Sequence, residues 1–306
     1  MGKHQRDRNQ SGQAQQLVTQ EAERYSSFRL EMNAEVRELV EGGGAIRGVR
    51  YETPDGTREA RAALTVAADG RDSLVRQQAG LRVVGTAPPI DVLWFRLSRR
   101  KGDPEEPTGY IGGSRFVVLI NRGDYWQVGY VLPKGADQGV RAAGLESFRR
   151  SVGEAVPEDA DRTDEIQDWD QVKLLSVQVN RLRRWYRPGL LCLGDAAHAM
   201  SPVGGVGINL AIQDAVAAAN ALAEPLRAGR AELRHLRAVQ LRRELPIRIL
   251  QGLQSLAHRR IVAPAVGGGG IPSPPLPVRA LLGLRIVRNL PARIIGFGIW
   301  PVHVRP

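Results

Sequence analysis

Residues 187–215 constrain the fold more than any other part of the chain, and they read RPGLLCLGDAAHAMSPVGGVGINLAIQDA. Residues 190–193 form a short continuous apolar run, which is typical of a parallel strand covered on both faces. An acidic turn, Gly194-Asp195, follows this predicted strand, and a glycine-rich loop leads from there into a predicted helix. Because open α/β sheets bind ligands at the carboxyl ends of their strands, the segment predicts a ligand site beside Asp195.

The residue types of this segment suit a planar ligand that carries a sugar-alcohol chain. The Asp195 carboxylate can accept hydrogen bonds from hydroxyl groups. Gly204, Gly205 and Gly207 let the backbone approach a flat ring because they have no Cβ. The free N–H groups and the dipole of the following helix favour negative charge at its start, which suits a ring that becomes anionic on reduction.

The segment resembles the second cofactor motif of the flavin monooxygenases of the p-hydroxybenzoate hydroxylase type. The matching positions are Gly194, Asp195, His198, Pro202, Gly205, Gly207, Asn209 and Asp214. The resemblance implies that the acidic residue holds the ribityl chain of FAD and that the helix start lies against the pyrimidine edge of the isoalloxazine. The cofactor-binding residues expected here are Gly194, Asp195, Pro202, Gly204, Gly205, Gly207, Ile208 and Asn209. The alternative is an ordinary glycine-rich turn between a strand and a helix.

A second match lies upstream, in the sequence LTVAADGRDSLVR of residues 64–76. Residues 64–68 read as a strand, Asp69-Gly70 as a turn, and residues 73–79 as the start of a helix. The segment resembles the other internal signature of the same family, with Asp69, Gly70, Arg71, Ser73 and Arg76 as the matching positions. The resemblance implies that Asp69, Gly70 and Arg71 border the FAD pyrophosphate and ribose. An ordinary turn would be the better interpretation if the later motif were absent.

Members of that family open with a strand and a G-x-G-x-x-G turn that seats the pyrophosphate on the first helix. The present sequence has no such match, and its residues 17–25 resemble a helix that lies well inside complete members. We therefore expect a first stretch of the FAD-binding domain, on the order of a hundred residues, to be missing through truncation or a misassigned start. Without the N–H donors of that stretch, the chain as given is expected to bind FAD poorly.

The predicted fold class is α/β with mixed α+β character. An incomplete Rossmann-like FAD-binding domain is expected over residues 1–82, a mostly antiparallel β-sheet substrate domain over 83–180, the return to the FAD-binding domain over 181–228, and a C-terminal helical region over 229–306. The pattern predicts strands over residues 28–40, 45–52, 91–97, 116–121, 126–132 and 172–179, helices over 142–152 and 158–169, and a glycine- and proline-rich break at 267–277. Five aromatic residues of the sheet region are interpreted as core first and as pocket lining second: Trp94, Phe116, Tyr125, Trp126 and Tyr130.

Composition indicates a globular protein, because 306 residues with 42% hydrophobic content can bury a sizeable core. Cys192 is the single cysteine, and its place in a buried strand favours packing over nucleophilic chemistry. The five histidines are scattered, so no metal site is expected. The N-terminus lacks the apolar run of a signal peptide, and a cytoplasmic location is expected.

The net charge of +11 invites a nucleic-acid interpretation, but its distribution argues against one. Much of the arginine excess lies in residues 227–260 and 279–305, interleaved with aliphatic residues at helical spacing. That pattern fits solvated helix faces first, and peripheral contact of basic C-terminal helices with a membrane second. No nucleic-acid motif and no uninterrupted apolar span of about eighteen residues is present.

The resemblance implies an NAD(P)H-dependent flavin monooxygenase, which uses O2 and a flavin hydroperoxide to hydroxylate a small organic substrate of aromatic or isoprenoid-like character. The alternatives are a flavin-dependent reductase or dehydrogenase on the same scaffold and a non-catalytic truncated fragment. No catalytic residue is predicted. His198 sits in the turn of the motif, where a satisfied polar contact is the preferred interpretation.

Overall fold

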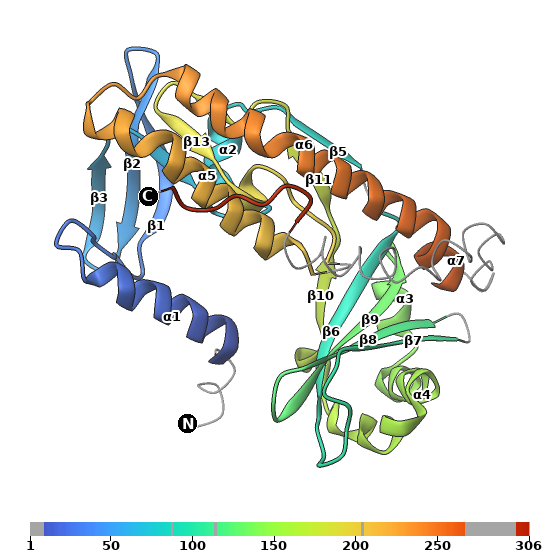
Figure 1. Cartoon of the computed structure of the whole chain (residues 1–306). Coiled ribbons are helices and arrows are strands. Elements are labelled where there is room, and N and C mark those ends of the chain that lie inside the picture. Colours follow the sequence, from blue (N-terminus) through green and yellow to red (C-terminus); the bar gives the residue numbers. More distant parts are fainter. Residues whose placement is uncertain (1–8, 87, 113–114, 203–204, 267–297, 306) are drawn as a thin grey trace.

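The computed structural model describes residues 9–86, 88–112, 115–202, 205–266 and 298–305 (Figure 1). Its strands are β1 (Glu35–Gly42), β2 (Ala45–Thr53), β3 (Gly56–Arg61), β4 (Thr65–Ala67), β5 (Val83–Thr86), β6 (Ile90–Ser98), β7 (Thr108–Gly112), β8 (Arg115–Asn121), β9 (Tyr125–Pro133), β10 (Lys173–Ser176), β11 (Val179–Leu182), β12 (Tyr186–Arg187) and β13 (Leu190–Cys192). Its α-helices are α1 (Asn9–Glu23), α2 (Leu74–Gln78), α3 (Asp137–Ala142), α4 (Leu145–Ala155), α5 (Gly207–Arg227), α6 (Leu233–Ala257) and α7 (Ala263–Val266). Three 3₁₀ helices, η1 (Pro157–Glu165), η2 (Trp169–Gln171) and η3 (Gly194–Ala196), and one π-helical turn, η4 (His258–Val262), complete the chain as described.

A short sheet with a parallel strand pair lies in the largest core. β13 pairs in parallel with β4 and antiparallel with β12. Its residues are fully buried against side chains of β2, α5 and α6, including Ile46, Leu210 and Val239. This burial explains the apolar run, and the predicted parallel strand is confirmed. Among the described strands β4 has a partner on one side only, and its central residue Val66 is 48% exposed.

A three-stranded antiparallel sheet in the order β1-β2-β3 flanks this core. The β1–β2 hairpin turns at Gly43-Gly44, where both residues have positive φ. The predicted strand pair is therefore present. However, β1 begins at Glu35, so the prediction that the strand includes residues 28–34 is wrong. Those residues alternate hydrophobic and polar side chains, but they are mostly exposed, and no described strand pairs with them.

A five-stranded antiparallel sheet in the order β10-β6-β9-β8-β7 forms the second body. Helix α4 packs on one face through Phe148 and Val152, within a core that includes Trp126 and Ile166. The other face receives Val262 and Val266 from the end of the α6–η4–α7 rod. The rod therefore runs from the first core to the sheet (Figure 1).

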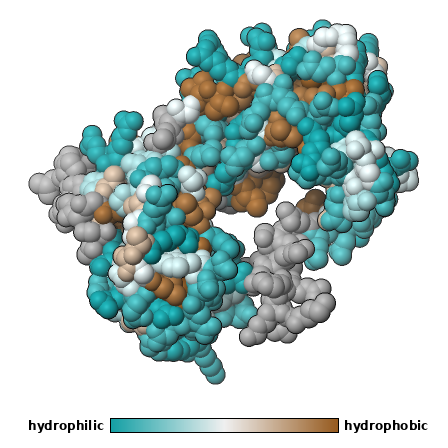
Figure 2. Space-filling view, turned by 180° about the vertical axis from the view of Figure 1, so that it is seen from behind, coloured by the Kyte–Doolittle hydropathy of each residue, from teal (hydrophilic) through white to brown (hydrophobic). Residues whose placement is uncertain are grey.

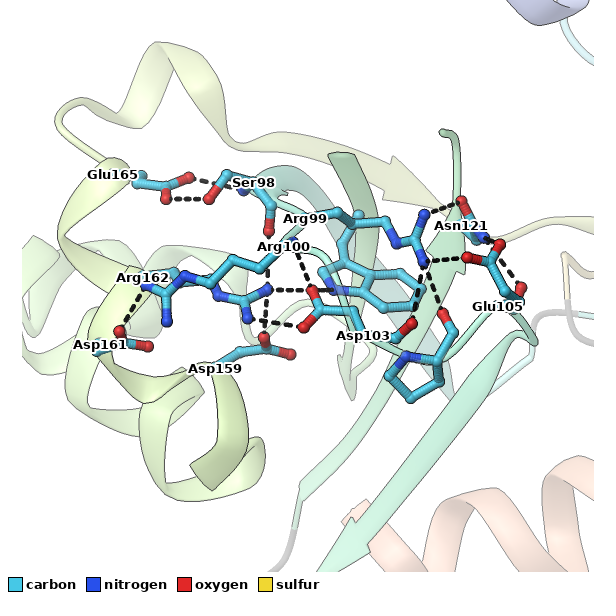
Figure 3. A network of polar contacts seen from close by, with 12 residues as sticks. Ser98, Arg99, Arg100, Asp103, Glu105, Asn121, Asp159, Asp161, Arg162 and Glu165 are labelled. Atoms are coloured by element: carbon cyan, nitrogen blue, oxygen red, sulfur yellow. Dashed lines mark hydrogen bonds and ion pairs between the residues drawn. The ribbon is translucent and has the colours of Figure 1, made fainter. Parts of the chain in front are cut away.

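A polar network ties the β6–β7 connection to η1 (Figure 3). Asp103 accepts hydrogen bonds from Arg162 Nη1 at 2.5 Å and Nη2 at 2.9 Å, and from Trp126 Nε1 at 3.2 Å. Arg162 is 4% exposed and also pairs with Asp159 at 2.7 Å. The Arg162 bonds hold the pKa of Asp103 well below its ordinary value, although burial works in the opposite direction.

Several predicted boundaries are wrong for local physical reasons. Residues 158–169 form the 3₁₀ helix η1 and the start of η2 instead of one helix, since Asp168 caps a new turn by accepting the amide of Asp170. Residues 142–152 span the break between α3 and α4. The predicted strand 172–179 is divided between β10 and β11, and β7 was not predicted. The predicted break at 267–277 and most of residues 279–305 lie outside the described residues.

Helices α5 and α6 lie side by side over the first core, and residues 298–305 run along α5 (Figure 1). The Asn220 amide holds this C-terminal segment, because its Nδ2 donates to the His303 carbonyl at 2.8 Å and its Oδ1 accepts from the Arg305 amide at 3.0 Å. From behind, hydrophobic residues reach the surface in separate patches between hydrophilic ones (Figure 2). In the described part of the chain, no helix has the length and apolarity needed to cross a bilayer.

Candidate functional site

The two predicted motifs meet at one edge of the short sheet. Because β4 and β13 run in parallel and the Leu193 amide donates to the Ala67 carbonyl at 2.9 Å, both strands end at the same level. Asp69 follows β4 and Asp195 follows β13, as the sequence placed them. Across this edge Arg71 Nη2 lies 3.7 Å from Asp195 Oδ2, and both side chains remain about one-third exposed. The edge therefore presents a solvent-accessible carboxylate next to a guanidinium.

Hydrogen bonds from Arg76 connect the turn after β4 to the turn after β13. Its buried side chain donates from Nη1 to the carbonyls of Asp195 at 3.5 Å and Ala196 at 3.4 Å, and from Nη2 to the Arg71 carbonyl. Helix α2 holds Arg76 in place, because Ser73 Oγ caps the helix by accepting the Arg76 amide at 3.0 Å. Asp69 Oδ2 accepts the amide of Val75 at 3.2 Å, so it too caps the helix.

The turn that carries Asp195 is packed tightly on α5. Gly194 has φ of +57°, and a Cβ placed there would lie 3.1 Å from the Cβ of Ala211. Its amide donates to Asp214 Oδ2 at 3.1 Å. A residue with a side chain would be strained by its backbone angle and by the helix, so glycine is required by the fold itself.

A buried ionic group supports this turn. Asp214 Oδ2 lies 2.5 Å from His198 Nε2, and its Oδ1 accepts a hydrogen bond from Arg243 Nε at 2.8 Å. Burial alone raises the pKa of Asp214, but the charges and hydrogen bonds of His198 and Arg243 outweigh it and place this pKa below its ordinary value. His198 also stacks on Trp185, with ring centroids 5.0 Å apart, and is 1% exposed. His198 is thus a structural residue in this arrangement.

The arginines of residues 227–260 were interpreted as solvated, and for Arg243 this interpretation is wrong, since Arg243 is 0% exposed. Its Nη1 also donates to Gln213 Oε1 at 2.9 Å. A signal for this burial exists in the sequence: Arg243 stands seven residues after Leu236 and four before Ile247, both of which face the core. An arginine on the apolar face of a helix must find an acidic partner, and Asp214 supplies it.

The start of α5 faces the same edge and carries the remaining predicted residues. Its N-cap residue, Val206, provides no side-chain hydrogen bond to the first turn. Gly207 has room among the described residues, because the one of their atoms that an added Cβ would meet is Met200 Cβ, at 4.0 Å. Gly205 is exposed with φ of +62°, and Ile208 is 65% exposed.

Three further predicted positions belong to the same segment of the sequence. Pro202 and Asn209 are half-buried. Gly204 lies outside the described residues. The structure therefore brings together Asp69, Gly70 and Arg71 with Gly194 and Asp195 at the strand ends, and Gly205, Gly207 and Ile208 at the start of the following helix.

The chemistry open to this edge is recognition of a ligand by polar contacts. Cys192 is fully buried, and burial raises the pKa of its thiol to about 12, so it stays protonated and unreactive. The described residues hold no cluster of side chains suited to a metal ion. A partly exposed carboxylate, a guanidinium and the start of a helix instead suit hydroxyl groups and negative charge.

The aromatic residues of the sheet belong mainly to its packing. Trp126 is 1% and Tyr130 is 9% exposed, and both lie in the core beneath α4. Trp94 and Phe116 pack against the cluster formed with α7 on the other face. Tyr125 lies under the Arg96 guanidinium, 4.5 Å from the ring centroid.

Comparison with known proteins places this geometry in a family. Residues 5–252 match the family model described as FAD binding domain. The chain is 36% identical over 263 residues to 6-methylpretetramide 4-monooxygenase of Streptomyces rimosus, which covers 81% of this chain and 62% of that protein. It is 31% identical over 211 residues to digeranylgeranylglycerophospholipid reductase 2 of Methanothermobacter thermautotrophicus, covering 67% of this chain and 52% of that protein. The chain thus spans between one-half and two-thirds of the length of these relatives.

Solved structures share the fold at low sequence identity. Anhydrotetracycline hydroxylase OxyS of Streptomyces rimosus aligns with 97% of this chain and 56% of its own, with a TM-score of 0.66 and 19% identity. The pqsL protein of Pseudomonas aeruginosa, described as a probable FAD-dependent monooxygenase, aligns with 84% of this chain and 71% of its own, with a TM-score of 0.66 and 22% identity. The predicted mixed α/β class is confirmed.

Proposed function

We propose, because the chain belongs to the FAD binding domain family, that it binds FAD at the edge formed by Asp69, Asp195 and the start of α5, and that it acts as an NAD(P)H-dependent monooxygenase. The observation that carries the proposal is the convergence, on one sheet edge, of a partly exposed Asp195 carboxylate and a helix start whose N-cap side chain makes no hydrogen bond to the first turn. The two motifs lie far apart in sequence, and an edge built for packing alone would bury or cap these groups.

The residues present fit FAD in chemical type. The Asp195 carboxylate would accept hydrogen bonds from the ribityl hydroxyls. The N–H groups at Gly207 and Ile208 would face the pyrimidine edge of the isoalloxazine, where negative charge develops on reduction. Arg71 and the Asp69-Gly70 turn would border the pyrophosphate and ribose. Gly207 gives independent support, since the chain itself leaves space where its side chain would be.

Bound FAD would supply the chemistry, taking electrons from a nicotinamide nucleotide and activating O2 for transfer of one oxygen atom to an organic substrate. The residues of the chain would bind FAD and orient it. Arg76 fixes both turns, Asp214 fixes Gly194, and the buried strands keep water from the underside of the site. We assign no proton-transferring residue.

The substrate proposed is a small hydrophobic organic molecule, either aromatic or isoprenoid-like. The name of the Streptomyces relative describes a monooxygenase, which favours the oxygenase assignment. A flavin-dependent reductase is the second candidate, because another relative is named as a reductase of a lipid with isoprenoid chains. Both candidates require the same FAD site.

Two measurements on the purified chain test this proposal. Saturable quenching of flavin fluorescence when FAD is titrated with the purified chain would support the cofactor site, even at the weak affinity expected, whereas no saturable quenching would favour a non-catalytic fragment. NADH and NADPH oxidation is then followed with an oxygen electrode. Oxygen consumption is expected for a monooxygenase, and nicotinamide oxidation that needs an isoprenoid acceptor in place of oxygen would assign the reductase instead.

A further inference from the structure

The outer face of α6 carries hydrophobic side chains that no described part of the chain covers. Five of them are spaced by four, four, four and three residues, and they share one face of the helix. We call them the α6 stripe: Leu241, Leu245, Ile249, Leu253 and Leu256, each between 41% and 62% exposed. The opposite face of α6 packs into the core through Leu236, Val239 and Leu250. Because α6 is hydrophobic on both faces, its outer face calls for a partner.

Positive charge surrounds the α6 stripe. Residues 233–260 contain one carboxylate, Glu244, and seven arginines: Arg234, Arg237, Arg242, Arg243, Arg248, Arg259 and Arg260. All of these arginines except Arg243 are exposed. Glu244 lies 3.9 Å from Arg248, and Glu232 pairs with Arg234 at 3.2 Å. Within the described residues, Arg237, Arg259 and Arg260 have no carboxylate partner.

A tryptophan stands at one end of the α6 stripe. Trp300 is 51% exposed, and the guanidinium of Arg242 lies over its ring at 5.1 Å from the centroid. Arg242 Nη2 also donates to the Pro301 carbonyl at 3.4 Å. An exposed indole held beside aliphatic and basic side chains is typical of the boundary between lipid headgroups and acyl chains.

We propose that the α6 stripe and its arginines form a docking surface for an anionic lipid bilayer, with α6 lying in the plane of the interface. The aliphatic side chains would enter the acyl boundary while the arginine heads reach the headgroup phosphates. The stripe runs along about four turns of α6, roughly 22 Å. Helix α6 itself lies along the outer edge of the molecule (Figure 1). An acidic protein would also match the arginines, but the five residues of the stripe are all aliphatic, and the tryptophan lies at their end beside an arginine, as at a lipid interface. The proposal goes beyond the FAD site and is independent of it.

Vesicle sedimentation of the full chain tests this surface. Binding to phosphatidylcholine vesicles is compared with binding to vesicles that also contain phosphatidylglycerol, at low and high salt. We expect roughly tenfold stronger binding to the anionic vesicles, weakened by salt, because both charge and burial contribute. The double variant Leu245→Glu/Leu253→Glu is expected to lose this binding. A variant of equal charge change, Ile111→Glu/Leu174→Glu, replaces similarly exposed residues of the five-stranded sheet and should bind as the unmodified chain does.

A second variant distinguishes loss of vesicle binding from loss of folding. The variant Arg237→Gln/Arg259→Gln alters only exposed side chains and should reduce anionic binding while the far-ultraviolet circular dichroism stays unchanged. Equal binding to both vesicle types, or equal loss in the stripe and sheet variants, would overturn the proposal. Sedimentation equilibrium adds a third result: a dimer that the stripe variant converts to monomer would assign the surface to a second copy of the chain and not to lipid.

Discussion

At the scale of single residues, the support of the site depends on one buried carboxylate. Asp214 is 0% exposed and compensates Arg243, which is equally buried. Its removal would leave the guanidinium without a carboxylate, and breaking a buried pair in this way costs about 3–5 kcal/mol. We therefore expect Asp214→Ala to lower the free energy of unfolding by that amount, as measured by urea denaturation with circular dichroism.

A double variant shows whether the uncompensated charge is the cause. Asp214→Ala/Arg243→Met removes the charge as well as its partner and should recover a substantial part of the loss, because an apolar side chain of similar volume is tolerated where an unpaired charge is not. If the double variant is no more stable than Asp214→Ala, the contribution of Asp214 lies in its bonds to Gly194 and His198 instead.

At the scale of elements, glycine substitutions around the start of α5 distinguish residues required for stability from residues required for FAD binding. Gly207→Val should leave the thermal unfolding midpoint nearly unchanged, since the chain leaves space at this position, yet it should abolish FAD binding by filling that space. Gly194→Val is the matched comparison, and there the backbone angle and Ala211 predict loss of stability. Retained FAD binding by Gly207→Val would show that α5 does not approach the flavin.

The connection between η1 and the β6–β7 loop predicts a dependence of stability on pH. Arg162 lowers the pKa of Asp103 in the folded chain, so Asp103 contributes stability above its ordinary pKa and loses it as the pH falls from about 4 toward the lowered value. Asp159 acts in the opposite sense, because burial raises its pKa. Asp103→Asn should therefore be less stable than the unmodified chain at neutral pH and lose less on acidification. Parallel profiles of urea midpoint against pH would contradict this assignment.

At the scale of the whole molecule, the sequence predicted the parts whose signals are local. The apolar run of β13, the turn after β4 and the glycines before α5 were sufficient for the two strands, the helix and the family. β7 was missed because Thr108–Gly112 contains two glycines and is mostly exposed, so it lacks a strand pattern. The aspartate-rich η1 was predicted as part of a longer helix, because periodicity alone does not distinguish a 3₁₀ helix from an α-helix.

The tertiary partners could not be predicted in the same way. Arg243 resembles the exposed arginines around it, and only the packing of α6 on α5 shows that it meets Asp214. The bonds from Arg76 to Asp195 and Ala196 join positions about 120 residues apart, which sequence patterns do not report. The role of each cofactor-binding residue remains a prediction that binding measurements must test.

The most direct test is an FAD titration, followed by flavin fluorescence quenching, of three proteins: the unmodified chain, Asp195→Ala and Asp164→Ala. Asp164 is an exposed carboxylate on η1, so its replacement makes the same charge change away from the site. Loss of a hydrogen-bonding carboxylate costs about 1–3 kcal/mol, so Asp195→Ala should weaken binding by roughly 5- to 150-fold. The account predicts that loss for Asp195→Ala and an unchanged dissociation constant for Asp164→Ala. Equal FAD affinity for the unmodified chain and Asp195→Ala would contradict the placement of the flavin at this edge.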